Sequence, residues 1–185
     1  MQRDTMRLLS IISALLIAGG SSLFADNFTL KSENLLGQLT KTQEFSGFGC
    51  DGKNISPELH WSDAPKGTKS FAVTVYDPDA PTGSGWWHWV VFNIPSSVTS
   101  IPENFGDTTK KQPISAIQSI TDFGKAGFGG ACPPKGDKPH RYMFTVHALD
   151  VDHLDLDDKA SAALVGYMLG MHTIAKSTLI SYYGR

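Results

Sequence analysis

Short apolar segments separated by frequent turn signals are the feature that most restricts the fold of this chain. Glycine and proline clusters recur at close intervals, among them Pro65-Lys66-Gly67 and Pro81-Thr82-Gly83. Between such clusters, residues 68–76, 87–94 and 141–149 are rich in β-branched and aromatic side chains. This composition is typical of strands. We therefore predict a mainly β domain with antiparallel pairing.

Helical spacing is confined to the last part of the chain. Ser161 can cap a helix in which Leu164, Met168 and Met171 recur at intervals of three and four residues. We expect this apolar row to face the core, and residues 177–183 to form one more short strand. No linker or charge run divides the chain, so one domain is predicted.

Residues 1–25 have the composition of an export signal. Arg3 and Arg7 precede an apolar run of 11 residues, and small residues follow up to Ala25. The order basic, apolar, small is that of a secretory signal peptide, and the run is shorter than the roughly 20 residues that span a bilayer. We expect cleavage near Ala25. Residues 26–185 would then form a periplasmic or secreted domain without a stable membrane anchor.

The charge of the chain argues against a nucleic-acid partner. The formal net charge is −2, and removal of Arg3, Asp4 and Arg7 with the signal peptide would make it −3. Lysines and arginines are scattered among acids rather than gathered in a basic stripe. Binding to nucleic acid normally requires such a stripe.

Cys50 and Cys132 are the two cysteines of the chain. After export both would lie in an oxidising compartment, which favours a disulfide between them. In the chain-entropy description, a bridge that closes a loop of this length stabilises by about 4–5 kcal/mol. Two free buried thiols are the alternative.

Successive side chains of a strand alternate between its two faces. By this alternation, a titratable residue stands at one end of each of three predicted strands. Asp77 ends the apolar face of the first strand. His88 begins a face that continues through Val90 and Phe92, and His140 begins the apolar face of the third strand. Antiparallel neighbours would bring these ends to one edge of a sheet, provided that the third strand is also antiparallel to the first.

Such a cluster can bind a small anion. With one or both imidazoles protonated and Asp77 orienting one ring, His88 and His140 present donors to a phosphate or a carboxylate. In the plainer alternative, each histidine is an ordinary residue at the edge of a sheet.

Two chemical alternatives have less support. Asp77, His88 and His140 are acceptable zinc ligands, but no local spacing such as His-Glu-x-x-His accompanies them. A hydrolase would need a nucleophile, and no Gly-x-Ser-x-Gly motif occurs; Cys132 is the nearby candidate, but we expect it to be oxidised. We therefore predict no metal, no cofactor and no enzymatic activity.

Longer motifs stand at the ends of the three predicted strands: Asp77-Pro78-Asp79-Ala80-Pro81, Gly85-Trp86-Trp87-His88-Trp89-Val90-Val91, and Pro133-Pro134-Lys135-Gly136 before His140-Arg141-Tyr142. They resemble the phosphatidylethanolamine-binding protein family. Residues 54–61, 129–134 and 163–169 are similar to its bacterial Raf kinase inhibitor-like branch, in an exported version. The similarity extends over roughly residues 27–184.

The resemblance implies an antiparallel β-sandwich with Greek-key connections, a few peripheral helices and an anion pocket at strand ends. Carried over position by position, the ligand-binding residues would be Asp77, Asp79, His88, His140 and Tyr142. Cys132 stands where eukaryotic members have a glycine whose backbone helps to hold the anion. Its N–H is a candidate ligand contact if the backbone dihedrals permit.

The function expected from these observations is that of a secreted, non-enzymatic binding protein for a small anion or a phosphorylated headgroup. The alternative is an inhibitor or modulator of a partner protein, such as a protease, a kinase or a host factor, that acts through surface loops. A homodimer is compatible with either function.

Overall fold

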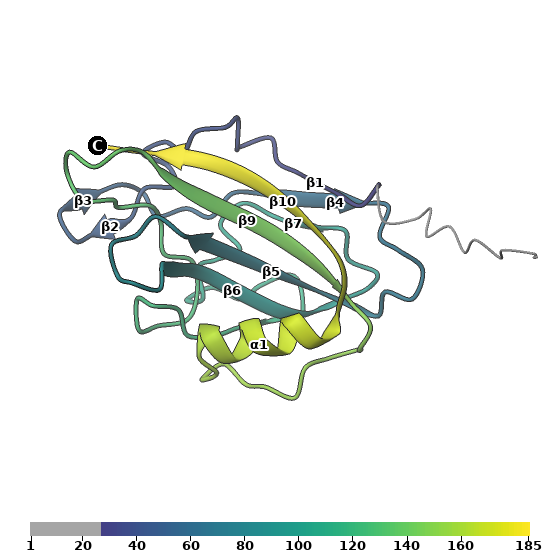
Figure 1. Ribbon diagram of the computed structural model, residues 1–185. Coiled ribbons are helices and arrows are strands. Elements are labelled where there is room, and N and C mark those ends of the chain that lie inside the picture. The colour runs from purple at the N-terminus through teal and green to yellow at the C-terminus, as the bar shows by residue number, and fades with distance from the viewer. Residues whose placement is uncertain (1–26) are drawn as a thin grey trace, which may run out of the picture.

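A computed structural model describes residues 27–185 (Figure 1). The expected signal peptide, residues 1–25, lies outside the described residues. Within the described part, no helix is long and apolar enough to cross a membrane.

The main sheet has five antiparallel strands in the order β10-β9-β5-β6-β8. Their bounds are Thr173–Tyr183 for β10, His140–Leu149 for β9, Ser70–Asp77 for β5, Trp86–Pro95 for β6 and Ile117–Gln118 for β8. The three strands predicted from composition correspond to β5, β6 and β9. The predicted last strand is longer than expected, because β10 begins directly after the helix (Figure 1).

Two smaller sheets complete the β structure. Strands β1 (Thr29–Lys31), β4 (Leu59–Ser62) and β7 (Ser100–Ile101) form one sheet, and β2 (Ser46–Gly47) pairs with β3 (Cys50–Asp51) in a short hairpin. The apolar residues of β1, β4 and β7 share one core with the inner face of the main sheet. The prediction of a mainly antiparallel β domain is confirmed. The Greek-key sandwich stays a prediction.

Helix α1 (Ala162–His172) packs on the other face of the main sheet, near β6 and β9 (Figure 1). The Ser161 side chain accepts a hydrogen bond from the Leu164 N–H at 3.2 Å, so the predicted cap is confirmed. The predicted core-facing row is wrong, since Leu164 and Met171 are exposed while Val165 and Leu169 are buried. Apolar residues lie on most sides of this helix, so their spacing alone could not identify the buried face.

His147 of β9 also lies on this second face of the sheet, and it should make stability depend on pH. Burial, and then the neighbouring Lys176 ammonium, lower the pKa of His147 from 6.5 to about 4. Between these two pH values the unfolded chain binds a proton that the folded chain does not. We expect the free energy of unfolding to fall as the pH decreases through this window, by about 2 kcal/mol from pH 6.5 to 5.

Urea unfolding at pH 7 and pH 5 tests this expectation. His147→Gln, which cannot take up the proton, should lose less stability between the two pH values than the parent chain does. Equal losses in the two proteins would contradict the assignment.

Candidate functional site

The site lies at one end of the main sheet, where the ends of three neighbouring strands come together. β5 ends at Asp77, β9 begins at His140, and β6 carries His88 near its start; β5 lies between the other two and is antiparallel to both. His140 Nδ1 donates a hydrogen bond to Asp77 Oδ2 at 2.8 Å. The convergence expected from strand direction is therefore present, including the third strand.

His88 reaches the site through a β-bulge. Val75 pairs with Trp89, but Tyr76 pairs with Trp87, so His88 is an extra residue in β6. A bulge shifts the alternation by one position and redirects a side chain. The face predicted for His88 is thus wrong: Val90 and Phe92 pack toward α1. The His88 ring instead contacts the ring of Tyr142, with centroids 5.1 Å apart.

A cavity of about 170 Å³ opens at this edge. Its lining includes four of the predicted site residues, Cys132 and a set of apolar neighbours: Asp77, His88, His140, Tyr142, Cys132, Phe48, Ala80, Pro81, Thr82, Trp86, Phe123, Pro133 and Pro134. Asp79 is the predicted site residue that does not line it.

The Asp77–His140 pair is almost completely buried. Asp77 Oδ1 accepts a further hydrogen bond from the Asp79 N–H at 2.8 Å, so both carboxylate oxygens are satisfied. Because Nδ1 of His140 is held by Asp77, Nε2 is the ring nitrogen left for a ligand. In the structure Nε2 lies 3.5 Å from Asp137 Oδ2. Asp77 thereby fixes the orientation and the tautomer of His140.

His88 is oriented by the backbone. Its Nδ1 donates to the Gly129 carbonyl at 2.7 Å, and the Gly129 N–H donates to the His88 carbonyl at 2.8 Å. Burial lowers the pKa of His88, which favours a neutral ring. An anion at Nε2 would reverse this preference, because it stabilises the protonated ring. Anion binding is therefore expected to be coupled to proton uptake.

Tyr142 carries a hydroxyl that lacks a hydrogen-bond partner among the described residues, although the side chain is only 1% exposed. Burial and the nearby Asp77 charge raise the pKa of Tyr142, while the Cys132 amide opposes them weakly. A buried polar group without a partner costs free energy, and such groups are rare in folded proteins. Tyr142 also lines the cavity, so its hydroxyl is a candidate donor to a ligand there.

Asp79 holds the loop after β5 against β9. Its carboxylate accepts hydrogen bonds from the Arg141 N–H at 2.9 Å and from the guanidinium at 2.8 and 2.9 Å. These bonds hold the pKa of Asp79 well below its usual range. With its carboxylate committed to Arg141, Asp79 is placed to position Asp77 rather than to touch a ligand.

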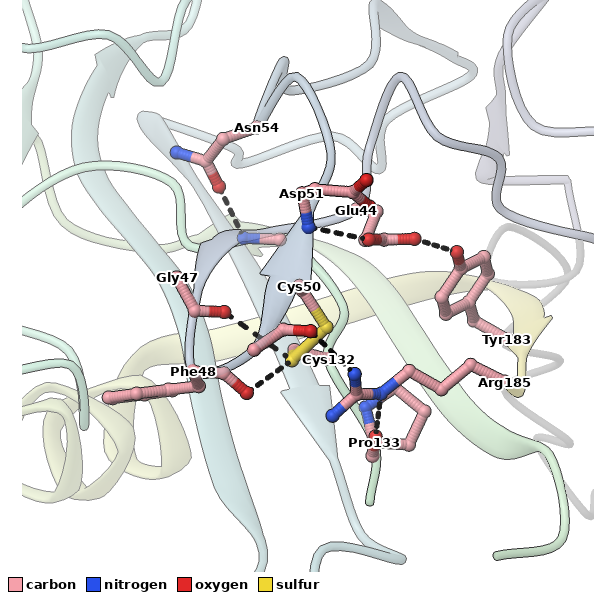
Figure 2. Close-up of a disulfide and its surroundings, with 12 residues drawn as sticks. Glu44, Gly47, Phe48, Cys50, Asp51, Asn54, Cys132, Pro133, Tyr183 and Arg185 are labelled. Atoms are coloured by element: carbon pink, nitrogen blue, oxygen red, sulfur yellow. Dashed lines mark hydrogen bonds between the residues drawn. A yellow bond between two sulfur atoms is a disulfide. The ribbon is translucent and has the colours of Figure 1, made fainter. Parts of the chain in front are cut away.

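Cys50 and Cys132 form a disulfide that joins the β2–β3 hairpin to the cavity wall (Figure 2). Arg185 adds a polar bridge between the same two segments, since its Nε donates to the Pro133 carbonyl at 2.6 Å and its Nη1 to the Gly49 carbonyl at 2.8 Å. The hairpin that carries Phe48 is thereby fixed over the site.

Buried Glu44 braces the hairpin from the other side. Its carboxylate accepts hydrogen bonds from the Asp51 N–H at 3.0 Å and from the Tyr183 hydroxyl (Figure 2). Sequence reasoning missed Glu44, Phe48 and Phe123. A single acid and two dispersed phenylalanines form no motif, so the sequence offered no signal for them.

The fold and the site define a small antiparallel β domain of the binding-protein kind, with one buried polar pocket at the strand ends of its main sheet. Residues 36–184 match the family described as phosphatidylethanolamine-binding protein. The chain is 60% identical over 148 residues to the UPF0098 protein YbcL of Escherichia coli strain K12, which covers 79% of this chain and 80% of YbcL. It is 53% identical over 139 residues to YbhB of the same organism, covering 75% and 87% of the two chains.

Solved structures give the same assignment. The crystal structure of E. coli YbcL, described as a new member of the mammalian PEBP family, matches with a TM-score of 0.82 at 55% identity and covers 86% of this chain and 99% of that one. The putative PEBP homologue CT736 from Chlamydia trachomatis matches with a TM-score of 0.70 at 30% identity, covering 85% and 97%. The chain belongs to the phosphatidylethanolamine-binding protein family.

Proposed function

We propose that this protein binds a small anion, a phosphate or a carboxylate group, in the cavity between Asp77, His88, His140 and Tyr142, and that it does so outside the cytoplasm without altering the ligand chemically. The unpartnered Tyr142 hydroxyl carries the proposal. Tyr142 lines the cavity, and a buried donor without a partner among the described residues gains a hydrogen bond when an acceptor reaches it.

The other donors of the cavity suit an anion whose binding is accompanied by protonation of an imidazole ring. The lining contains no lysine or arginine, so the positive charge would come from His88 or His140. Cys132 lines the same cavity, so its N–H is a further candidate donor. Hydrogen bonds to a charged group are about twice as strong as those between neutral groups.

Binding without turnover is supported by the lack of an activated nucleophile in this lining. The Cys132 sulfur is held in the disulfide, and burial keeps the Tyr142 hydroxyl protonated. The disulfide and the basic-apolar-small order of the first residues both suit an exported protein.

Titration with inorganic phosphate, followed by NMR of the histidine rings, tests the proposal. The ring signals of His88 and His140 should shift together and saturate. Tyr142→Phe should weaken phosphate binding at least tenfold, because it removes a hydrogen bond to a charged ligand. The same substitution should leave the free energy of unfolding without phosphate unchanged or about 1 kcal/mol higher, since it removes an unsatisfied buried hydroxyl.

Lys66→Ala, on the distant Pro65-Lys66-Gly67 turn, is the control and should bind phosphate as the parent chain does. Phosphate binding that leaves both imidazoles unperturbed, or that is unaffected by Tyr142→Phe, would refute the site.

A further inference from the structure

Three aromatic rings, Phe48, Trp86 and Phe123, line the cavity beside its polar residues, and we name them the aromatic collar. Phe48 and Phe123 are nearly parallel, with ring centroids 5.8 Å apart and an angle of 13° between the planes. Trp86 meets Phe123 edge-on at 5.5 Å, and the His88 ring meets Phe123 at 5.4 Å. The collar is therefore continuous with the anion-binding residues.

Phe48 has an exposed side chain and an unfavourable backbone conformation. The side chain is 70% exposed, and its backbone has a φ of 53°, in the left-handed region that bulky residues avoid. Exposure of a large ring and an unfavourable backbone conformation both cost free energy in the absence of a ligand. Such a combination at the mouth of a cavity suggests a contact that forms on binding.

The hairpin keeps Phe48 in place in the unliganded protein. The disulfide follows Phe48 by two residues, Arg185 binds the Gly49 carbonyl, and Glu44 binds the Asp51 N–H (Figure 2). A collar that is fixed before binding loses little conformational entropy when a ligand enters. Its geometry can therefore contribute to ligand selection.

The size of the cavity exceeds that of a bare phosphate. Its volume of about 170 Å³ is comparable to the roughly 150 Å³ of an apolar cavity that holds a benzene ring. Cations already lie beside the collar, because Lys125 Nζ is 5.8 Å from the centroid of Phe45 and the Arg185 guanidinium binds Gly49. Phe45 in turn packs in a tilted arrangement against both Phe48 and Phe123. An aromatic ring on a ligand would extend this cluster of rings.

We propose that the cavity prefers anions whose charged group is attached to an aromatic ring, such as an aryl phosphate or an aryl carboxylate. The ring lies in the aromatic collar, and the anionic group lies at Tyr142 and the two imidazoles. This inference rests on the proposed function and names its ligand class. Each favourable aromatic contact strengthens binding by roughly 2- to 10-fold.

Calorimetry with three probes tests the preference: inorganic phosphate, phenyl phosphate and phosphorylethanolamine. Phenyl phosphate should bind about tenfold more tightly than either of the others. Phe48→Ala should reduce this ratio to about two, whereas Phe48→Tyr should retain the ratio. Leu36→Ala is the matched control, because Leu36 is 87% exposed and does not line the cavity.

Each outcome decides between the two proposals. Equal affinities for all three probes would refute the aromatic preference and leave the anion site standing. Tighter binding of phosphorylethanolamine would also refute it, by showing that the collar receives a cation. Failure of both inorganic phosphate and phenyl phosphate to bind would refute the anion site itself. A melting temperature of Phe48→Ala equal to that of the parent chain ensures that loss of the preference is not loss of the fold.

Discussion

Replacing Cys50 and Cys132 together by serine is expected to lower the free energy of unfolding by about 4 kcal/mol. The disulfide closes a loop of 82 residues, which contains β4, β5 and β6. Opening that loop returns conformational freedom to the unfolded chain. Few single changes to this protein should cost as much, because a domain is typically stable by only about 5–15 kcal/mol.

Urea unfolding of the parent chain and the double variant, with and without reductant, measures this effect. Reductant should destabilise the parent chain by a similar amount and leave the double variant unchanged. A loss below about 1 kcal/mol would contradict the expected entropic effect and would show that the unfolded chain is already restricted without the covalent bond.

Replacing His140 by alanine should lower the free energy of unfolding by about 3 kcal/mol and abolish measurable phosphate binding. His140 and Asp77 are both almost fully buried, and the substitution leaves the Asp77 carboxylate with one hydrogen bond where it had two. Removing one partner of a buried hydrogen bond is costly, because the Asp77 carboxylate then stays buried without the hydrogen bond that offset its loss of hydration.

A second substitution separates the two consequences. In the variant Asp77→Asn/His140→Ala the buried charge is gone, so about half of the lost stability should return while phosphate binding stays absent. His153→Ala is the control, because His153 is 65% exposed and remote from the cavity lining. A His140→Ala protein that still binds phosphate with the parent affinity would contradict the role of this ring.

Family membership narrows the expected ligand without naming it. The family description refers to a phospholipid headgroup, but one fold can carry different ligands, so the residues of each pocket decide. Here the polar part of the cavity consists of a carboxyl group, two imidazoles and two hydroxyls, and the apolar part consists of aromatic rings, prolines and an alanine. Under the proposals above, selection among anions depends on the collar and not on a lysine or an arginine, because the lining contains neither.

The strands of the site were predictable because their side chains alternate along the chain. β5, β6 and β9 are rich in β-branched and aromatic residues, and their directions follow from antiparallel pairing. That was sufficient to expect Asp77, His88 and His140 at one edge. The family motif added Tyr142, which the structure places in the cavity, and Asp79, which the structure places beside Arg141.

Three features needed the tertiary structure. The bulge at His88 depends on how β6 pairs with β5, and a strand sequence does not specify its own register irregularities. The buried face of α1 depends on which surface the sheet presents, because the helix is apolar on most sides. Asp79 turns to Arg141 because the two become neighbours only after β5 and β9 pair.

The sequence by itself thus determined the β class and placed a titratable residue at the end of each of three strands, because both depend on local alternation. The meeting of the third strand with the other two and the disulfide were decided by the tertiary structure. The tertiary structure decided which nitrogen of each histidine faces the cavity, left the Tyr142 hydroxyl without a partner and brought Phe48 from a distant hairpin to the mouth of the site. These features arise from contacts between residues far apart in the chain, and no local pattern encodes such contacts.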